Sequence, residues 1–206
     1  MGRFPRLRNR PPYLGAIGAS GNAPKPALPL ATRRARLARD PRFCHDLGRG
    51  TLSESIESRL QALGLDLPNA PAPAANYVPA LVAGGFLFVS GQLPMENGAV
   101  AVKGTLGDGV DLADGVRAAR LCLLNVLAQA KAALGGDLVK VARCVKLGGF
   151  VASTPAFTDH PKVVNGASDL LVEVMGETGR HTRFAVGVAA LPLGAAVEVE
   201  AMFLLR

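Results

Sequence analysis

The longest regular pattern in the chain is that of an amphipathic helix at residues 111–134. Its apolar residues recur at spacings of three and four and therefore share one face. Asp111 and Asp114 suit the positive N-terminal end of a helix, and Gly135-Gly136 would close it. The apolar face consists of Val116, Ala119, Leu123, Val126, Leu127 and Ala130. Such a face must pack against another layer of structure.

Strand-like segments lie on both sides of this helix. Before it, residues 77–82 and 86–92 predict a β-hairpin around Gly84-Gly85, and a short strand is predicted at 99–103. After it come a strand at 139–151, a second helical region opening at Thr154-Pro155, and two strands at 183–191 and 195–205. This order predicts an α+β fold in which two helices pack on one face of a mixed sheet.

The last predicted strand indicates that the sheet does not stand alone. Glu198 and Glu200 alternate with Val197, Val199 and Ala201, so the strand has one polar and one apolar face. A pair of glutamates on a strand is most often simply solvated. Because the two helices can cover only one face of the sheet, we expect the other face to meet water, a cleft or another subunit.

The first 51 residues differ in charge and composition from the rest of the chain. Residues 1–51 hold eleven Lys or Arg against Asp40 and Asp46, a net charge of +9, which leaves −2 for residues 52–206. Repeated prolines oppose helix formation, so we interpret this segment as a disordered basic leader. It is either an organelle presequence or, as we favour, upstream sequence translated from a start site placed too early. The folded domain is predicted at 52–206, beginning with a capping box at 51–54 and a short helix bearing Ile56, Leu60 and Leu63.

Composition argues against several classes of protein. Cys44, Cys122 and Cys144 lack the spacing of a disulfide framework or a zinc site, which favours a reducing compartment, the cytoplasm, and no metal. No apolar run is long enough to span a bilayer. The mildly acidic domain with only two tyrosines in the chain argues against nucleic-acid binding.

A few polar residues embedded in apolar strands are the candidates for chemistry. They are Tyr77, Ser90, Arg183, Glu198 and Glu200. Ser90 has no visible base, and Arg183 before a long apolar run either caps a strand end in solvent or points a guanidinium into a pocket. Only the second arrangement would bind a carboxylate through two hydrogen bonds.

The ordered series of these residues resembles the Rid (YjgF-like) imine/enamine deaminase family. The matching segments cover nearly all of residues 70–206, and the helix before them resembles a longer subgroup whose members would begin near Ser53, making Leu52 a misread start codon. The segments are Tyr77-Val78, Phe88-Val-Ser-Gly-Gln-Leu-Pro94, Asn165, Thr182-Arg-Phe-Ala-Val186, Leu191-Pro192 and Val197-Glu-Val-Glu-Ala201.

The resemblance implies a chorismate-mutase-like fold, a homotrimer and a cleft between adjacent subunits. It implies hydrolysis of 2-imino or 2-enamino acids such as 2-aminoacrylate to 2-keto acids and ammonia, without metal or cofactor. In this interpretation Arg183 grips the substrate carboxylate and Glu198 lies near the attacking water. Tyr77, Ser90, Gly91 and Asn165 line the cleft, with Asn165 acting through its backbone.

Three positions depart from the family pattern and keep alternatives to the deaminase open. Ala185, Gly187 and His181 stand where the archetype has cysteine, glutamate and proline. These departures leave the substrate range open. The alternatives are a non-catalytic carboxylate-binding trimer and the ribonuclease or translation-inhibitor activity once assigned to the family.

Overall fold

The computed structural model describes residues 55–70 and 76–206 of the 206-residue chain. The predicted basic leader, the capping box at 51–54, the domain boundary after residue 51 and Cys44 lie outside the described residues.

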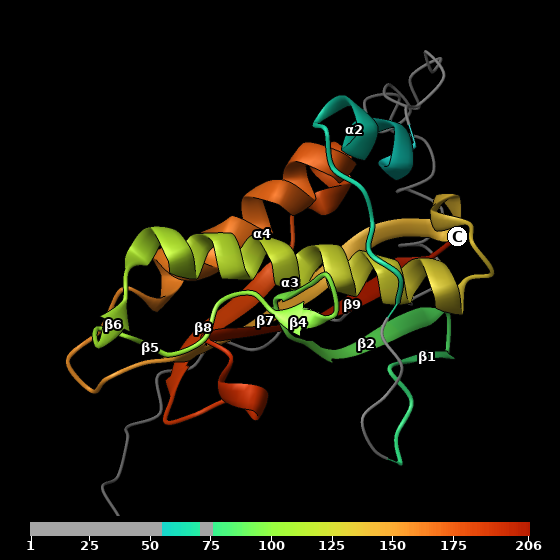
Figure 1. Cartoon of the computed structure of the whole chain (residues 1–206). Coiled ribbons are helices and arrows are strands. Elements are labelled where there is room, and N and C mark those ends of the chain that lie inside the picture. The colour runs from blue at the N-terminus through green and yellow to red at the C-terminus, as the bar shows by residue number, and fades with distance from the viewer. Residues whose placement is uncertain (1–54, 71–75) are drawn as a thin grey trace, which may run out of the picture. The chain divides into compact units, whose positions relative to one another are not determined.

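A five-stranded mixed sheet forms one layer of the domain (Figure 1). Its strands are β1 (Ala80–Ala83), β2 (Phe86–Gln92), β7 (Val141–Ala152), β8 (Thr182–Val188) and β9 (Val197–Leu205). The spatial order is β1-β2-β9-β7-β8, in which β7 and β8 run parallel and every other pair is antiparallel. β8 is therefore an edge strand, and the crossover that connects it to β7 contains a long helix, α4 (His160–Met175).

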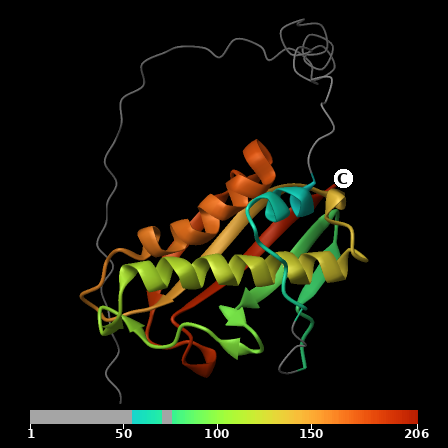
Figure 2. The ribbon, with the colours of Figure 1, turned by 45° about the horizontal axis from the view of Figure 1, so that its top comes forward.

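Two long helices cover one face of this sheet (Figure 2). α3 (Leu112–Ala133) begins at its N-cap Asp111, whose side chain accepts a hydrogen bond from the Asp114 backbone N–H at 2.8 Å. It ends before Gly135 and Gly136, which both have a positive φ. α4 packs along α3 and over β7 and β8. The predicted α+β class with two helices on one face is confirmed.

A third, short helix, α2 (Ile56–Ala62), packs on α4. It begins one residue after Ser55, whose hydroxyl accepts from the Ser58 N–H at 3.1 Å. Ile56 and Leu60 are buried as predicted, and Gly64 follows the helix with φ 67°. The backbone N–H of Leu65 then bonds Leu60 O, a common helix ending.

The remaining elements are short and lie outside the main sheet. They are β3 (Met95–Glu96), β4 (Ala99–Val100), β5 (Thr105–Leu106), β6 (Gly109–Val110), and the 3-10 turns η2 (Leu138–Lys140), η3 (Gly176–Gly179) and η4 (Pro192–Gly194). The strand predicted at 99–103 is thus shorter than expected. Its first two residues pair with β3, and Lys103 forms only an isolated bridge to Ala195.

The second helix also begins later than the sequence predicted. Thr154-Pro155 does not open α4, because residues 154–157 form a turn in which the Phe157 N–H bonds Thr154 O. The Thr154 N–H meanwhile bonds Leu106 O on β5. The helix starts at His160, and Pro161 occupies its first turn, where a missing N–H costs nothing.

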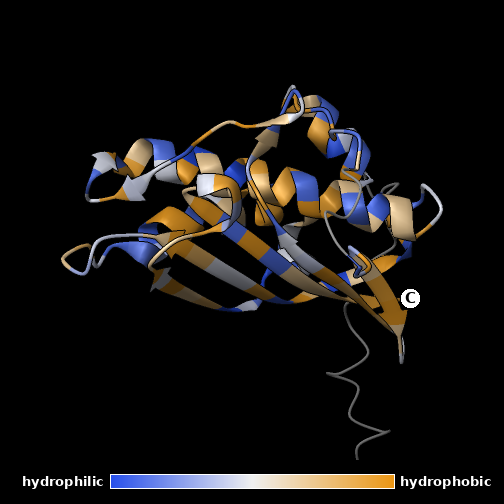
Figure 3. Ribbon diagram, turned by 60° about the horizontal axis from the view of Figure 1, so that its bottom comes forward, coloured by the Kyte–Doolittle hydropathy of each residue, from blue (hydrophilic) through white to orange (hydrophobic). Residues whose placement is uncertain are grey.

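The opposite face of the sheet carries no helix among the residues that the structure describes (Figure 3). On β9 the buried residues alternate with half-buried Glu198, Glu200 and Met202, as predicted for a strand with one covered face. Aromatic side chains accompany them. The rings of Phe150 and Phe184 meet edge to face with their centroids 5.2 Å apart, and Phe88 is 39% exposed. This open face carries apolar and acidic groups and also Lys146, whose Nζ lies 5.1 Å from the centroid of the Phe184 ring.

Candidate functional site

Arg183 lies on β8 and faces the helices. Its strand partner Leu147 is fully buried beneath them, which fixes the side of the sheet that Arg183 occupies. The guanidinium donates from Nη1 to the Ser168 hydroxyl at 2.9 Å and from Nη2 to the Pro161 carbonyl at 3.3 Å. Arg183 is nevertheless exposed. The strand therefore presents a charged fork that is anchored to α4 yet reachable from outside.

His181 supports this arrangement through Ser168. Its Nδ1 lies 2.6 Å from the Gly179 carbonyl, which can only accept, so Nδ1 carries the proton. Its Nε2 lies 3.0 Å from the Ser168 hydroxyl. With a neutral ring, the Ser168 O–H donates to Nε2 while its oxygen accepts from Arg183. The three side chains form one hydrogen-bonded chain.

Asn165 belongs to the same group by helix geometry. Residues four apart and three apart share a face of a helix, so Asn165 lies between Pro161 and Ser168 on the stripe that Arg183 contacts. Its side chain is exposed. Since its N–H is used inside the helix, the side chain and the second lone pair of its carbonyl oxygen are the groups open to a ligand.

The other predicted residues gather around Glu198. The carboxylate of Glu198 lies directly over Gly91, where even a methyl group would overlap it. Gly91 sits in a bulge of β2, because the β2–β9 register shifts between Val89 and Gln92. The Ser90 hydroxyl donates to Val78 O at 3.2 Å, which holds the segment after Tyr77 against β2. Tyr77 itself is 49% exposed.

Among the carboxyl groups of residues 55–70 and 76–206, Glu198 is the one whose pKa the fold shifts clearly. Burial raises the pKa of Glu198 above its usual value, and the negative charge of Glu200 raises it further. Glu200 and Phe184 both cover Gly148 on the open face. A half-buried carboxyl group with a raised pKa suits proton transfer better than one fully solvated.

The structure thus sorts the predicted residues into two groups within one copy of the chain. Arg183 and Asn165 lie on the helix side, at the edge strand. Glu198, with Gly91 and Ser90 beside it, lies on the open side of the sheet, and β7 separates β9 from β8. One copy does not bring Arg183 and Glu198 to the same ligand.

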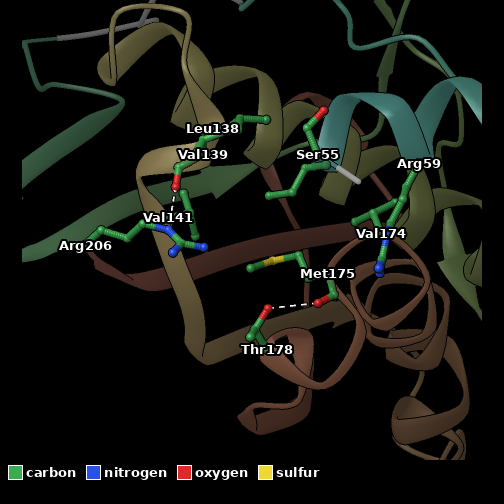
Figure 4. Close-up of a pocket in the computed structure, with 10 residues that line it drawn as sticks. Ser55, Arg59, Leu138, Val139, Val141, Val174, Met175, Thr178 and Arg206 are labelled. Atoms are coloured by element: carbon green, nitrogen blue, oxygen red, sulfur yellow. Dashed lines mark hydrogen bonds between the residues drawn. The ribbon is translucent and has the colours of Figure 1, made fainter. Parts of the chain in front are cut away.

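One pocket among the described residues lies away from the predicted site residues. Figure 4 shows a pocket of about 190 Å³ between α2, η2 and the chain end, where the Arg206 Nε donates to Val139 O at 2.7 Å and Thr178 donates to Met175 O. None of the predicted site residues lines it. Across residues 55–70 and 76–206, no cluster of His, Cys, Asp or Glu could hold a metal, and no helix is long and apolar enough to cross a bilayer.

The two described cysteines are free and buried. Burial raises the pKa of Cys144 to about 12 and that of Cys122 well above its usual range, so neither thiol is a ready nucleophile. Sequence reasoning missed Ser168 as an anchor of Arg183. The sequence did contain an indication, because Ser168 lies three residues after Asn165 and therefore on the same face of the predicted helix, fifteen residues before Arg183.

Comparison with known proteins identifies the family to which the chain belongs. The family described as "YjgF/chorismate mutase-like, putative endoribonuclease" matches residues 57–204. The chain therefore belongs to the YjgF-like Rid family, as the resemblance predicted.

Three similar proteins illustrate the relationship. Protein TCP17 of Trypanosoma cruzi is 52% identical over 151 residues, covering 73% of this chain and 94% of its own length. The RutC family protein y4sK of Sinorhizobium fredii is 34% identical over 134 residues, covering 65% and 90%. The crystal structure of Atu1372 from Agrobacterium tumefaciens, a protein of unknown function, is 54% identical with a TM-score of 0.70, covering 73% and 92%.

Proposed function

We propose that this protein hydrolyses reactive 2-imino and 2-enamino acids to 2-keto acids and ammonia, in a cleft shared by two copies within a homotrimer. The observation that carries the proposal is the division of the predicted site. An anchored arginine fork lies on one side of the sheet and a carboxyl group with a raised pKa on the other. The uncovered, partly apolar sheet face is a surface through which copies could bring the two groups together.

In the proposed reaction the cleft has to bind the substrate carboxylate, orient a water molecule and transfer protons. An enamine gains a proton on carbon to become an imine, whose carbon is electrophilic. Arg183 holds the carboxylate with two N–H donors while Ser168 and Pro161 fix the guanidinium. Glu198 accepts a proton from water as the oxygen bonds to the imine carbon. That proton passes to nitrogen, which gives a carbinolamine with adjacent hydroxyl and amino groups. The hydroxyl proton is then transferred to nitrogen as the C=O bond forms and the carbon–nitrogen bond breaks, releasing the keto acid and ammonia.

The test is keto-acid release from 2-aminoacrylate generated in situ by a dehydratase. Arg183→Ala loses both charge and fork, and Arg183→Lys keeps the charge alone, so both should reduce kcat/KM at least about tenfold, since charge-assisted hydrogen bonds are worth about 1.5–3 kcal/mol each. Glu198→Gln should reduce kcat with KM largely kept, because it removes proton transfer and not the carboxylate grip.

Arg180→Ala is the matched control. Arg180 is an exposed arginine three residues from Arg183 that pairs with Glu177, and its loss should leave the rate unchanged. Full activity in the Arg183 variants would show that the site is misplaced. No hydrolysis by the parent protein, with keto acid still bound, would leave a carboxylate-binding trimer as the function.

A further inference from the structure

A second polar pair lies along the same face of β8 as Arg183. The Ser153 hydroxyl, just after β7, lies 2.9 Å from Nε2 of His160, the first residue of α4. The Phe157 ring meets His160 edge to face at 5.4 Å. Both members of the pair are half-buried and line an open groove of about 530 Å³. The proposed mechanism uses neither side chain.

Gly187 is what leaves this pair accessible. A Cβ at position 187 would lie 2.5 Å from His160 Nε2 and 2.7 Å from the Ser153 hydroxyl. Any other residue would push into the Ser153–His160 hydrogen bond or separate its partners. Gly187 has an ordinary φ, so its role is the space it leaves and not backbone freedom. Because Gly187 has no side chain, the base of the groove is open at this position and the Ser153–His160 pair is reachable.

The lining of the groove includes Gly187 on β8, and Arg183 lies on the same face of this strand four residues earlier. Arg183, Ala185 and Gly187 alternate along β8 and therefore share the helix side of this edge strand. Between the fork and the Ser153–His160 pair the strand offers only a methyl group and a hydrogen. Arg183 also approaches the pair through α4, because its guanidinium bonds the carbonyl of Pro161, the residue after His160. The fork and the Ser153–His160 pair are therefore connected through the first turn of α4, and half-buried Ala185 separates them along the strand.

We propose that this groove is a side-chain subsite selecting 2-imino acids with a long, mainly apolar side chain that ends in a hydroxyl or similar hydrogen-bonding group. The inference rests on the proposed function, which puts the substrate carboxylate at Arg183. An extended strand advances about 3.3 Å per residue, so the backbones at positions 183 and 187 lie about 13 Å apart, and the Arg183 side chain, which reaches the Pro161 carbonyl beside His160, covers part of that distance.

The walls and the base of the groove define the chemistry it accepts. Pro155, Phe157 and Val188 provide apolar walls for a chain or a ring. At the base, the Ser153 oxygen keeps a lone pair, and one partner of the Ser–His bond can still donate or accept. A polar pair at the base of a groove discriminates against a substrate that lacks its partner group more strongly than an apolar wall rejects an extra one.

The imines derived from tyrosine, phenylalanine and alanine provide the test, made by an L-amino-acid oxidase and followed by trapping of unreacted imine with semicarbazide. The parent should prefer the tyrosine-derived over the phenylalanine-derived imine by at least about tenfold in kcat/KM. Ser153→Ala, His160→Phe and Gly187→Ala should each lose most of that preference, while hydrolysis of the alanine-derived imine stays within about twofold of the parent.

A measurement on the parent alone guards against misfolded variants. The 4-hydroxyphenyl keto acid should inhibit 2-aminoacrylate hydrolysis at least about tenfold more strongly than phenylpyruvate. Equal inhibition, or a tyrosine preference that survives all three substitutions in folded protein, overturns the subsite. Failure to hydrolyse any imine, the alanine-derived one included, overturns the proposed function instead.

Discussion

Ionisation of Glu198 is the step by which pH should control turnover. If the carboxylate accepts the proton from water, activity rises with pH as Glu198 loses its proton. Burial is the main cause of its raised pKa, and the charge of Glu200 on the same face adds to it. Both effects disfavour the ionised form. The acidic limb of the pH profile therefore lies higher than for a solvated glutamate.

Replacing Glu200 tests this dependence without touching Glu198. Glu200→Gln removes the neighbouring negative charge, so the pKa of Glu198 should fall and the acidic limb of kcat against pH should move to lower pH. Burial remains, so the limb should stay above that of a free glutamate. Glu173→Gln, an exposed glutamate paired with Arg120, is the control and should not move the limb. A limb that moves upward or stays fixed in Glu200→Gln contradicts the assignment of Glu198 as the base.

At the scale of elements, the sequence predicted what local pattern determines. The helix expected at 111–134 is found at Leu112–Ala133. It was predictable because its caps and its apolar face depend only on residues within and next to the helix. The strand predicted at 139–151 is β7, Val141–Ala152, since a 3-10 turn takes its first residues. The strands predicted at 77–82, 183–191 and 195–205 are found two residues shorter each, as Ala80–Ala83, Thr182–Val188 and Val197–Leu205, although β1 ends and β8 begins one residue outside the predicted range.

Features that depend on contacts between distant segments were not predictable. The turn at 154–157 begins where the Thr154 N–H bonds Leu106 O on β5, a residue far earlier in the chain. The Ser153–His160 bond needs the end of β7 to meet the start of α4, and nothing in either residue alone indicates it. For the candidate site, the sequence supplied the residues through family resemblance. Their separation onto two faces of the sheet required the strand order.

The contact between α4 and β8 should govern substrate affinity. Ser168→Ala removes the acceptor of Arg183 Nη1 and the partner of His181 Nε2, leaving the Pro161 carbonyl to hold the guanidinium through Nη2. A hydrogen bond of this kind contributes about 0.5–1.5 kcal/mol, so KM should rise about threefold to tenfold while kcat changes little.

A different residue that keeps a hydroxyl at position 168 should preserve the parent affinity for substrate. Ser168→Thr keeps the oxygen and should stay near the parent KM. The melting temperature should hold in both variants, because Ser168 and Arg183 lie at the surface of the packed core. Equal KM values for the alanine variant and the parent would show that Ser168 does not position the arginine.

At the scale of the whole molecule, the proposed site requires assembly of several copies. A single copy holds Arg183 beneath α4 and Glu198 on the uncovered face, so we expect catalysis only where one copy's arginine meets another copy's glutamate. Light scattering at micromolar concentration should give the mass of three chains. Phe88→Asp, which puts a charge on the exposed apolar part of the open face, should lower the mass and the activity together.

Mixing two inactive variants provides the decisive form of this prediction. In trimers formed at random from Arg183→Ala and Glu198→Gln chains, about a quarter of the shared sites combine an intact arginine with an intact glutamate from neighbouring copies, so about a quarter of the parental activity should return. Parent chains mixed equally with the double variant provide the control. They should also give about a quarter for a shared site, but about half if one copy holds both groups. Recovery in the first mixture cannot arise from sites within single copies, because neither variant chain contains both residues. No recovery in trimers confirmed to be mixed, together with half the activity in the control, would assign both residues to one copy and contradict the shared cleft.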